Sequence, residues 1–342
     1  MHRLEKNWYR VSAPHLILWP LSLAFGAAAA VRRALYRTGV LPTLRLPVPV
    51  IIVGNITVGG TGKTPLALWL AQFLRERGHA PGIVSRGYRG NAGGACKPRQ
   101  VHADSDPRTS GDEPVLLARR AGCPVWIGAR RAATARALLA AHPDCSVVIS
   151  DDGLQHYALA RDVEIAVIDG ARGFGNGMLL PAGPLREPPR RLACADAIVT
   201  NGAALFPHEE LPSTAPLFEM RLAGSIFYNL LNPDQQVGPE YFLQRHVHAV
   251  AGIGNPRHFF EHLRDLGVSF TAHPFPDHHA FSADDFAALI SPAGAGDAII
   301  VTEKDAVKCE RFCTENFWAL RVDAEVEPEL GGLVLRKLKK NS

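Results

Sequence analysis

The stretch from Val48 to Thr64, VPVIIVGNITVGGTGKT, most constrains what this chain can fold into. Its first part is an apolar, β-branched run, which is typical of a strand that is buried on both faces of a parallel sheet. Glycines and then Lys63-Thr64 follow this run at once. A strand, a glycine-rich loop and a helix start in this order predict a phosphate-binding loop, in which backbone N–H groups and a helix dipole bind an anion.

The residues of this loop have separate expected roles. Lys63 would contact the β- and γ-phosphates of a nucleotide, and the Thr64 hydroxyl would hold Mg²⁺. The general pattern G-x-x-x-x-G-K-[ST] has glycine where this chain has Thr57, so the loop is a variant. A glycine-rich turn with an incidental lysine is the alternative. The expected nucleotide-binding residues are Thr57, Val58, Gly59, Gly60, Thr61, Gly62, Lys63 and Thr64.

Length and composition exclude several classes of protein. A chain of 342 residues can hold about two domains, and 47% hydrophobic with 20% charged residues is the composition of a folded protein. The net charge of +4, without a stripe of interleaved basic and aromatic residues, argues against a nucleic-acid partner. Six scattered cysteines form neither a CxxC pair nor a disulfide framework, which favours a reducing, cytosolic compartment.

The segment from Ala13 to Val31 contains no acidic residue, lysine or arginine, and basic residues flank it on both sides. It is short for a transmembrane helix, and Pro20 would kink a helix. A signal peptide, a transmembrane helix and a buried core helix are alternatives. We favour a monotopic helix that lies in the membrane interface, with its basic flanks near anionic lipid.

Acidic residues follow two predicted strands. The strand Ser146–Ser150 leads into Asp151 and Asp152, as expected of a P-loop enzyme that holds Mg²⁺ or its waters. Neighbouring side chains of a strand point in opposite directions, so one carboxylate would sit at the metal and the other would serve the substrate or the loop. A plain Asp-Gly turn is the alternative, and Asp169, after the strand 163–168, is a rival for the metal role.

Several loops are also candidates for function. The basic loop 86–90 follows a predicted strand, Gly82–Ser85, at the edge where α/β sheets bind ligands, although a solvated turn is equally consistent with it. Residues 91–110 suggest a surface excursion, and Asp112 and Glu113 precede a helix predicted over 115–121. The long loop 173–189 carries Arg186 and Glu187, and loops of this length are usually functional or disordered.

A second domain is expected after about Asn201, where strands and helices alternate again. Its most specific feature is the stretch 273–279, HPFPDHH, with three histidines and one aspartate. A metal site is one interpretation, but zinc ligands normally have a more regular spacing and a fourth partner elsewhere. An acid/base or orienting role for one His–Asp pair is the preferred interpretation.

The chain resembles the tetraacyldisaccharide 4′-kinases of lipid A synthesis. Seven strings carry this resemblance, in the same order and over nearly the whole chain. They are GNITVGGTGKTP, SRGYRG, GDEP, DDGLQH, LLPAGPLREP, FPDHH and TEKDAVK. Each string is weak alone, but the ordered set is specific, and the departure at Thr57 is itself typical of that family.

The resemblance implies an enzyme that uses ATP and Mg²⁺ to phosphorylate the 4′-hydroxyl of a tetraacylated glucosamine disaccharide 1-phosphate. It implies that Asp112 is the catalytic aspartate and that His278 orients this carboxylate or tunes its pKa, with Lys63 as the phosphate clamp. Metal would be held by Thr64, Asp151 and Asp152. Residues near phosphate or lipid headgroup would be Arg86, Tyr88, Arg130 and Arg186.

The predicted fold is an α/β protein in three parts. Residues 1–46 would form a membrane-associated helical segment, 47–202 a P-loop-type parallel sheet with helices on both faces, and 203–342 a smaller α/β domain. Asp112 and His278 would then meet across the cleft between the two domains, and domain closure would gate catalysis.

The same resemblance implies an enzyme at the cytoplasmic face of a bacterial inner membrane, peripheral or monotopic, with a lipid substrate and no obligate protein partner. Two other functions remain open. One is a membrane-associated ATPase of the deviant P-loop type, although such loops usually carry lysine where Val58 stands. The other is a nucleotide-sensing adaptor that binds a nucleotide without catalysis.

Overall fold

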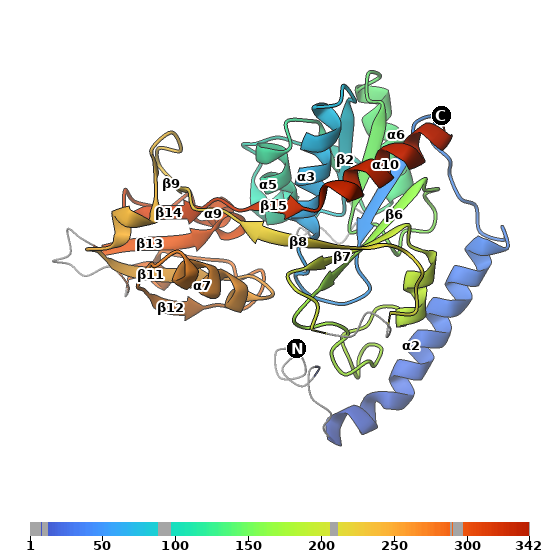
Figure 1. Ribbon diagram of the computed structural model, residues 1–342, viewed down its shortest axis with the longest axis horizontal. Helices are drawn as coiled ribbons and strands as arrows, with labels where there is room; N and C mark the ends of the chain where they lie inside the picture. Colours follow the sequence, from blue (N-terminus) through green and yellow to red (C-terminus); the bar gives the residue numbers. More distant parts are fainter. Residues whose placement is uncertain are drawn as a thin grey trace.

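The computed structural model describes residues 8, 13–87, 97–205, 211–287, 289 and 297–341. Figure 1 shows two α/β units side by side along the long axis of the molecule, each built on its own sheet. Helix α2 (Ala13–Arg37) lies along the outside of the larger unit, on the side away from the smaller one.

Nine strands of the described chain form the larger sheet. The order across this sheet is β15 (Asp323–Val326), β8 (Leu217–Ala223), β7 (Ala197–Asn201), β6 (Val163–Asp169), β1 (Val50–Gly54), β5 (Val147–Asp151), β2 (Pro81–Ser85), β4 (Val125–Ile127) and β3 (Arg99–Val101). The seven strands from β8 to β4 pair in parallel, and the two edge strands are antiparallel to their neighbours. The predicted P-loop-type parallel sheet is therefore confirmed.

Strand β1 is the central strand of this sheet, and every one of its residues is buried. Its neighbours β5 and β6 run in the same direction, with Val53 opposite Asp151 on one side and Ile165 on the other. The carboxyl ends of β1, β5, β2 and β6 consequently meet at one edge. This edge carries the glycine-rich loop, the acidic pair and the start of the basic loop after β2.

Helices cover both faces of the larger sheet, as predicted. Leu66, Leu70 and the apolar face of the C-terminal helix pack on one side, and Leu138 packs on the other. The helices are α3 (Lys63–Arg75), α4 (Pro107–Ser110), α5 (Asp112–Arg120), α6 (Arg131–Ala141) and α10 (Pro328–Asn341), with the 3₁₀ helix η1 (Pro189–Cys194).

The smaller unit is a second α/β layer structure. Six described strands form its sheet, in the order β10 (Gln236–Val237), β9 (Phe227–Asn229), β14 (Phe317–Leu320), β13 (Asp297–Thr302), β11 (His246–Ala251) and β12 (Thr271–Pro274). The 3₁₀ helix η3 (Pro239–Phe242) and α7 (Pro256–Asp265) bury side chains against one face, and α8 (Ala283–Ala287) and α9 (Glu303–Cys309) against the other. The prediction that a second, smaller α/β unit exists is therefore confirmed.

The boundary between the units differs from the division expected at residue 202. Strand β8 continues the larger sheet beside β7, and β15 returns to pair with β8 after the smaller sheet is complete. Helix α10 then buries Leu330, Val334 and Leu338 in the core of the larger unit. These segments belong to the larger unit because its sheet pairs with their backbone and its core buries their apolar side chains. A change in local composition along the chain does not reveal such long-range pairing.

Two local predictions were correct only in part. The excursion expected over 91–110 lies largely at the surface in its described part, but it includes the edge strand β3 and the short helix α4. Helix α5 begins at Asp112 instead of Val115, so Asp112 and Glu113 form its first turn. Negative side chains favour this position because they complement the helix dipole.

Helix α2 exposes apolar side chains and buries polar ones. His15 and Ser22 are 1% and 3% exposed, whereas Ile17, Leu21 and Leu23 are between 54% and 81% exposed. The Ser22 hydroxyl donates to Leu179 O at 2.9 Å and accepts from Ala182 N at 3.0 Å, which fixes the polar side to the loop before Arg186. The alternative of a buried core helix was wrong. Within the described ranges, no helix is long and apolar enough to cross a bilayer.

Candidate active site

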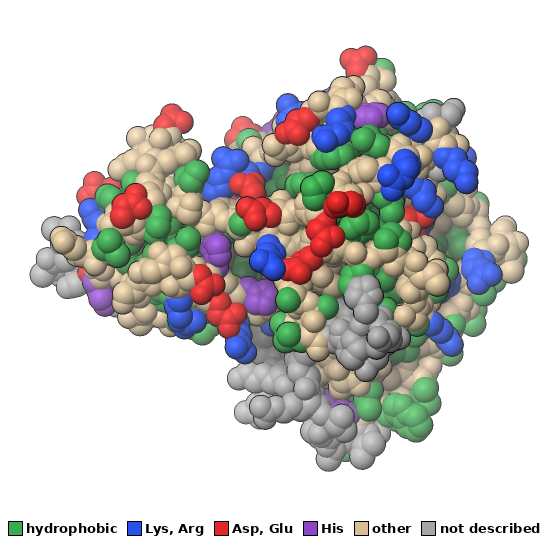
Figure 2. Space-filling model, viewed as in Figure 1, with side chains coloured by type: hydrophobic (Ala, Val, Ile, Leu, Met, Phe, Trp, Pro, Cys, Tyr) green, Lys and Arg blue, Asp and Glu red, His purple; other side chains and the backbone are tan. Residues whose placement is uncertain are grey.

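A cleft of about 1420 Å³ lies between the two units. Figure 2 shows histidine and charged side chains along the junction of the units, on the face that it presents. The glycine-rich loop and Arg186 line the cleft from the larger unit, and Gly254, His278 and Lys304 line it from the smaller one. The cleft is at the carboxyl ends of the parallel strands, where open α/β sheets bind ligands.

The glycine-rich loop has the backbone conformation that its sequence predicts. Gly59 and Gly62 have φ values of 108° and 90°, which glycine adopts without strain. A Cβ at Gly62 would lie 2.8 Å from Asn201 Nδ2, so space as well as conformation excludes a side chain there. Helix α3 begins at Lys63, so Lys63 and Thr64 form the first turn of a helix whose N-terminus faces the cleft.

The acidic pair after β5 is split between two environments, as predicted for neighbouring residues at a strand end. Asp152 lines the cleft, where Arg186 Nη1 donates to both of its oxygens at 3.0 Å and Lys63 Nζ lies 3.7 Å from Oδ1. Burial opposes its ionisation, but Lys63 and Arg186 outweigh this effect and lower the pKa of Asp152. Asp152 is therefore a carboxylate at neutral pH.

Asp151 lies beneath the cleft and is 1% exposed. Burial, with the nearby charges of Glu113 and Asp152, raises the pKa of Asp151 to about 7. Its Oδ2 accepts a hydrogen bond from Ser85 Oγ at 3.2 Å, and its Oδ1 has no hydrogen-bond partner among the described residues. A buried carboxylate oxygen without a donor is suited to a cation, because a cation would remove the cost of burying its charge.

Asp112 and His278 meet across the two units. Asp112 is 7% exposed at the start of α5, and its Oδ2 lies 3.2 Å from His278 Nδ1. Burial opposes ionisation of Asp112, but the hydrogen bond to His278 and the charges of Lys304 and Lys308 outweigh it and hold the pKa of this carboxyl well below its usual range. The same hydrogen bond raises the pKa of His278.

Lys304 connects the two units beside this pair. Its Nζ lies 2.9 Å from Glu113 Oε1, 3.3 Å from Asp277 Oδ1 and 3.9 Å from Asp112 Oδ2. Burial alone would lower the pKa of Lys304, but these three carboxylates raise it, so the ammonium stays charged. No local sequence pattern assigns a role to Lys304, although it lies in the TEKDAVK string, two residues after the end of the buried strand β13.

Backbone strain is concentrated at this cleft. Among the described residues, Asp152 and His278 are the non-glycine residues with positive φ, at 49° and 59°. Both line the cleft, and both carry a side chain that is paired with a residue from another element. Left-handed backbone at ordinary residues persists where the surrounding structure requires it, which is typical of functional sites.

The other predicted site residues are distributed as follows. Thr57 and Thr61 are buried, and Asn55 Nδ2 donates to both hydroxyls, at 3.4 and 3.1 Å. Arg86 and Arg130 do not line the cleft, and Tyr88 lies outside the described residues. Arg131, which the sequence analysis did not select, is buried beneath the acidic pair and donates to Asp151 O at 3.2 Å.

The residues of the HPFPDHH stretch have separate partners. His278 contacts Asp112, His273 Nε2 lies 2.9 Å from His248 Nδ1, and His279 Nε2 lies 3.2 Å from Asp285 Oδ2. These histidines therefore do not converge on one point, which favours the orienting His–Asp pair over a metal site within the stretch. The rival Asp169 accepts bonds from Ala171 N, Arg172 N and Asn255 Nδ2, so both of its oxygens are used structurally.

The smaller unit reaches the phosphate loop directly. Arg172 Nη1 donates to Gly254 O at 3.1 Å, and Asn255 Nδ2 donates to Asp169. A Cβ at Gly254 would lie 2.8 Å from Gly60 N, so the two backbones approach one another closely. The arrangement brings an anion-binding loop, the cations Lys63 and Arg186, and His278 with its partner Asp112 to one region around the cleft. Phosphoryl transfer needs groups of these kinds.

Comparison with known proteins agrees with this chemistry. A family model described as tetraacyldisaccharide-1-P 4′-kinase matches residues 14–339. The tetraacyldisaccharide 4′-kinase of Methylobacillus flagellatus is 48% identical over 98% of this chain and 95% of that protein. The enzyme of the same name from Dechloromonas aromatica is 49% identical over 98% and 97%.

A solved structure has the same fold. The crystal structure of LpxK from Aquifex aeolicus in complex with ATP superposes with a TM-score of 0.76 at 30% identity. The match covers 95% of this chain and 99% of that one, so it includes both units.

Proposed function

The chain belongs to the tetraacyldisaccharide 4′-kinase family, and we propose that it transfers the γ-phosphate of ATP to the 4′-hydroxyl of tetraacyldisaccharide 1-phosphate in lipid A synthesis. One observation supports this reaction most directly: the phosphate loop and His278 line the same cleft from different units, and His278 lies within hydrogen-bond distance of Asp112 at the start of α5. A site that only binds a nucleotide has no need of a second unit whose imidazole contacts a carboxylate of the nucleotide-binding unit.

The larger unit binds the nucleotide in this proposal. Backbone N–H groups of residues 59–64 surround the phosphates at the N-terminus of α3, whereas Val58 N donates to Pro184 O at 2.8 Å. Lys63 contacts the β- and γ-phosphates, and it exchanges its contact with Asp152 for the nucleotide. Arg186 remains beside Asp152 and supplies a second positive charge near the transferred group.

Residues in the cleft and directly beneath it also fit a Mg²⁺ ion. Thr64, Asp151 and Asp152 would hold it, since Asp151 Oδ1 is buried without a donor in the described part of the chain and hydroxyl and carboxylate oxygens are the ligands that Mg²⁺ prefers. When bound, Mg²⁺ neutralises charge on the phosphate oxygens. Arg131 donates to Asp151 O from beneath, which keeps the strand end and its carboxylates in place.

Asp112 acts on the acceptor hydroxyl. Its lowered pKa makes it a weak base, so its main tasks are to orient the hydroxyl and to accept the proton as the bond to phosphorus forms. A weak base is sufficient because the transition state of phosphoryl transfer is loose and requires little activation of the nucleophile. His278 is a positioning residue that fixes the direction of the carboxylate.

A substrate with four acyl chains stays in a bilayer, so the enzyme should work at a membrane surface. The exposed apolar side chains of α2 would lie in the interface at the cytoplasmic face of the inner membrane, as in a monotopic protein. The loop fixed to Ser22 continues to Arg186, which links this helix to the cleft through a short stretch of chain. One loop would thus contact the membrane-bound helix at one end and carry Arg186 into the cleft at the other.

The test is transfer of labelled γ-phosphate from ATP to tetraacyldisaccharide 1-phosphate in detergent micelles. We expect transfer by the intact protein and a loss of about 10²–10⁴-fold in Asp112→Asn, the range for removal of a general base. Asp104→Asn changes an exposed aspartate away from the cleft and should leave the rate unchanged. Hydrolysis of ATP without phosphorylation of the lipid would contradict the proposal and favour an ATPase.

A further inference from the structure

Four residues with metal-binding side chains share one face of the smaller sheet. His246 is opposite Asp297 in the pairing of β11 with β13, and His248 follows two residues later on the same face. On the other side of β11, His248 is opposite Thr271, so His273 also points to this face. The period of two along strands therefore gathers all four side chains from three neighbouring strands.

This group lies away from the catalytic cleft. His246 and Asp297 are the first residues of β11 and β13, whereas the residues that line the cleft, such as Ile253 and Thr302, follow or end these strands. The same face further along the strands is apolar and packs Val250, Ile299 and Val301 in the core. Along β11 and β13, polar side chains thus replace apolar ones on this face at the amino ends of the strands.

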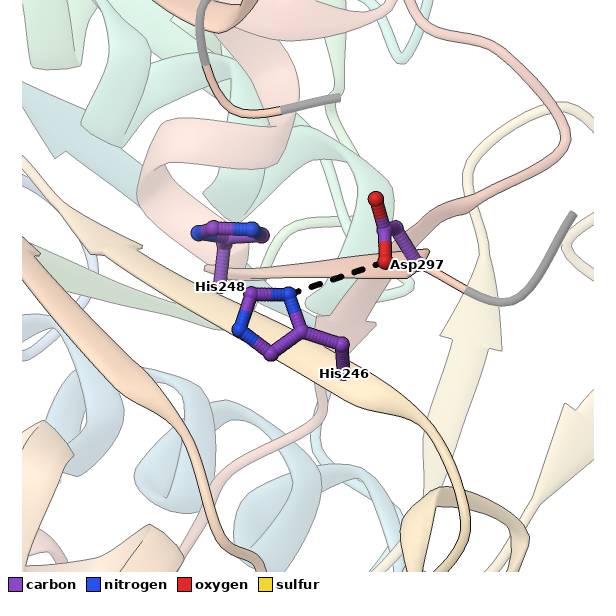
Figure 3. A group of neighbouring side chains, drawn as sticks. All are labelled: His246, His248 and Asp297. Atoms are coloured by element: carbon purple, nitrogen blue, oxygen red, sulfur yellow. Dashed lines mark ion pairs between the residues drawn. The ribbon is translucent and has the colours of Figure 1, made fainter. Parts of the chain in front are cut away.

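The ligand atoms are close enough for one ion. One possible ligand atom from each of His246, His248 and Asp297 lies within 4.8 Å of the other two. Among the described residues, no other group of three His, Cys, Asp or Glu side chains is this close. His246 Nδ1 lies 3.6 Å from Asp297 Oδ1, and Figure 3 shows the His246 ring directed at this carboxylate with the His248 ring beside it. Ligands of a tetrahedral zinc ion are roughly 3.4 Å apart, so small side-chain rotations would complete the site.

A second contact fixes the ring of His248. Its Nδ1 lies 2.9 Å from His273 Nε2, and His248 is 8% exposed. Histidine ligands of metals usually engage their other ring nitrogen with a neighbouring polar group, which sets the tautomer and the orientation of the ring.

We propose that His246, His248 and Asp297 bind a divalent transition-metal ion such as Zn²⁺, with His273 as the partner that orients His248. Nε2 of His248 is the ligand atom, because Nδ1 is used by His273. Two imidazoles and one carboxylate suit first-row divalent ions better than Mg²⁺, which prefers oxygen ligands and water. The ion joins β11 to β13, so it stabilises the smaller unit instead of taking part in phosphoryl transfer.

The test is titration of the metal-free, full-length protein with Co²⁺, which reports nitrogen ligation by its visible d–d absorption. An excess of Mg²⁺ fills the oxygen ligands of the catalytic cleft beforehand. We expect one Co²⁺ per chain, displacement of this ion by Zn²⁺, and an increase in thermal unfolding temperature with Zn²⁺. His246→Ala and His248→Ala should each lower the affinity for Co²⁺ at least tenfold and remove the thermal shift.

His102→Ala is the matched control, because it removes an exposed histidine of the larger unit and should leave Co²⁺ binding unchanged. The side chain of His246 is 62% exposed, so His246→Ala decides the matter even if the buried His248→Ala variant does not fold. The proposal is overturned if the intact protein does not take up Co²⁺ in the presence of Mg²⁺. It is also overturned if His246→Ala binds Co²⁺ with the affinity of the intact protein.

Discussion

His278 Nδ1 lies 3.2 Å from Asp112 Oδ2, which joins residues 166 positions apart in the chain and on different units. The histidine backbone is in the left-handed region at this point, so the loop pays a conformational cost to present the ring. Lys304 and Lys308 lie 3.9 Å from the same carboxylate oxygen. A cationic surrounding of this kind holds Asp112 in its charged form inside a largely buried position.

The pair should act as one unit in catalysis. His278→Gln should reduce lipid phosphorylation less than Asp112→Asn does, and the double variant should be no slower than Asp112→Asn alone, because the histidine acts through the carboxylate. The measurement is the rate of γ-phosphate transfer at saturating ATP for the two single variants and the double variant. Losses that multiply in the double variant would show that His278 acts independently.

The stability contributed by this pair should depend on pH. The raised pKa of His278 adds stability that is fully present below its unfolded pKa of about 6.5 and is lost as the pH rises through the folded value. The lowered pKa of Asp112 adds stability that is present above about 4 and is lost at lower pH. The excess of the intact protein over His278→Gln in unfolding temperature should therefore be largest between these limits and shrink above them. A difference that grows from pH 6 to pH 9 would contradict this assignment, and His102→Gln is the control.

Lys304→Met should change the pH profile of the reaction. Removal of the ammonium leaves Asp112, Glu113 and Asp277 without their shared cation, so the pKa of Asp112 should move upward. We expect activity to be lost at a higher pH on the acidic side of the profile. Lys337→Met is the control, because Lys337 pairs with Asp196 on the surface of the larger unit. An acidic limb at the same pH as in the intact protein would refute the prediction.

Gly254→Ala should weaken ATP binding. The added Cβ would lie 2.8 Å from Gly60 N, and backbone at that distance must shift to relieve the contact. Overpacking of this kind costs roughly 1–3 kcal/mol, so we expect about a tenfold loss of affinity in equilibrium binding of ATP. Gly332→Ala, in helix α10, meets only the end of the Arg336 side chain and serves as the control. Unchanged affinity in Gly254→Ala would mean that the two backbones separate when ATP binds.

The double variant Ile17→Asp/Leu21→Asp should no longer float with vesicles that contain anionic lipid. The two side chains are 81% and 60% exposed on α2, so charges there oppose burial in a membrane interface without disturbing the core. ATP binding in detergent should be retained. Leu243→Asp, at a 69% exposed position of the smaller unit, tests whether any exposed leucine has the same effect. Equal flotation of the intact protein and the double variant would exclude α2 as the membrane anchor.

The sequence alone determined the larger fold and the phosphate loop, because both depend on local chemistry. A buried β-branched run and glycines at fixed positions specify a strand and a loop wherever they occur, so Val50–Gly54 and the residues around Gly59 and Gly62 are as predicted. The resemblance carried by seven ordered strings added the pairing of Asp112 with His278, which no local pattern contains. The geometry of the Asp112–His278 pair depends on how the two units meet.

Tertiary structure decided the features that depend on contacts between distant parts of the chain. Strands β8 and β15 and helix α10 join the larger unit because its sheet edge and core accept them, not because their composition differs from that of the smaller unit. Arg131, for which the sequence suggested no role, lies buried beneath the acidic pair because it is the first residue of α6 and that helix packs against the sheet. Lys304, His246 and Asp297 acquired their neighbours in the same way, from strand register and from contact between units that are distant in sequence.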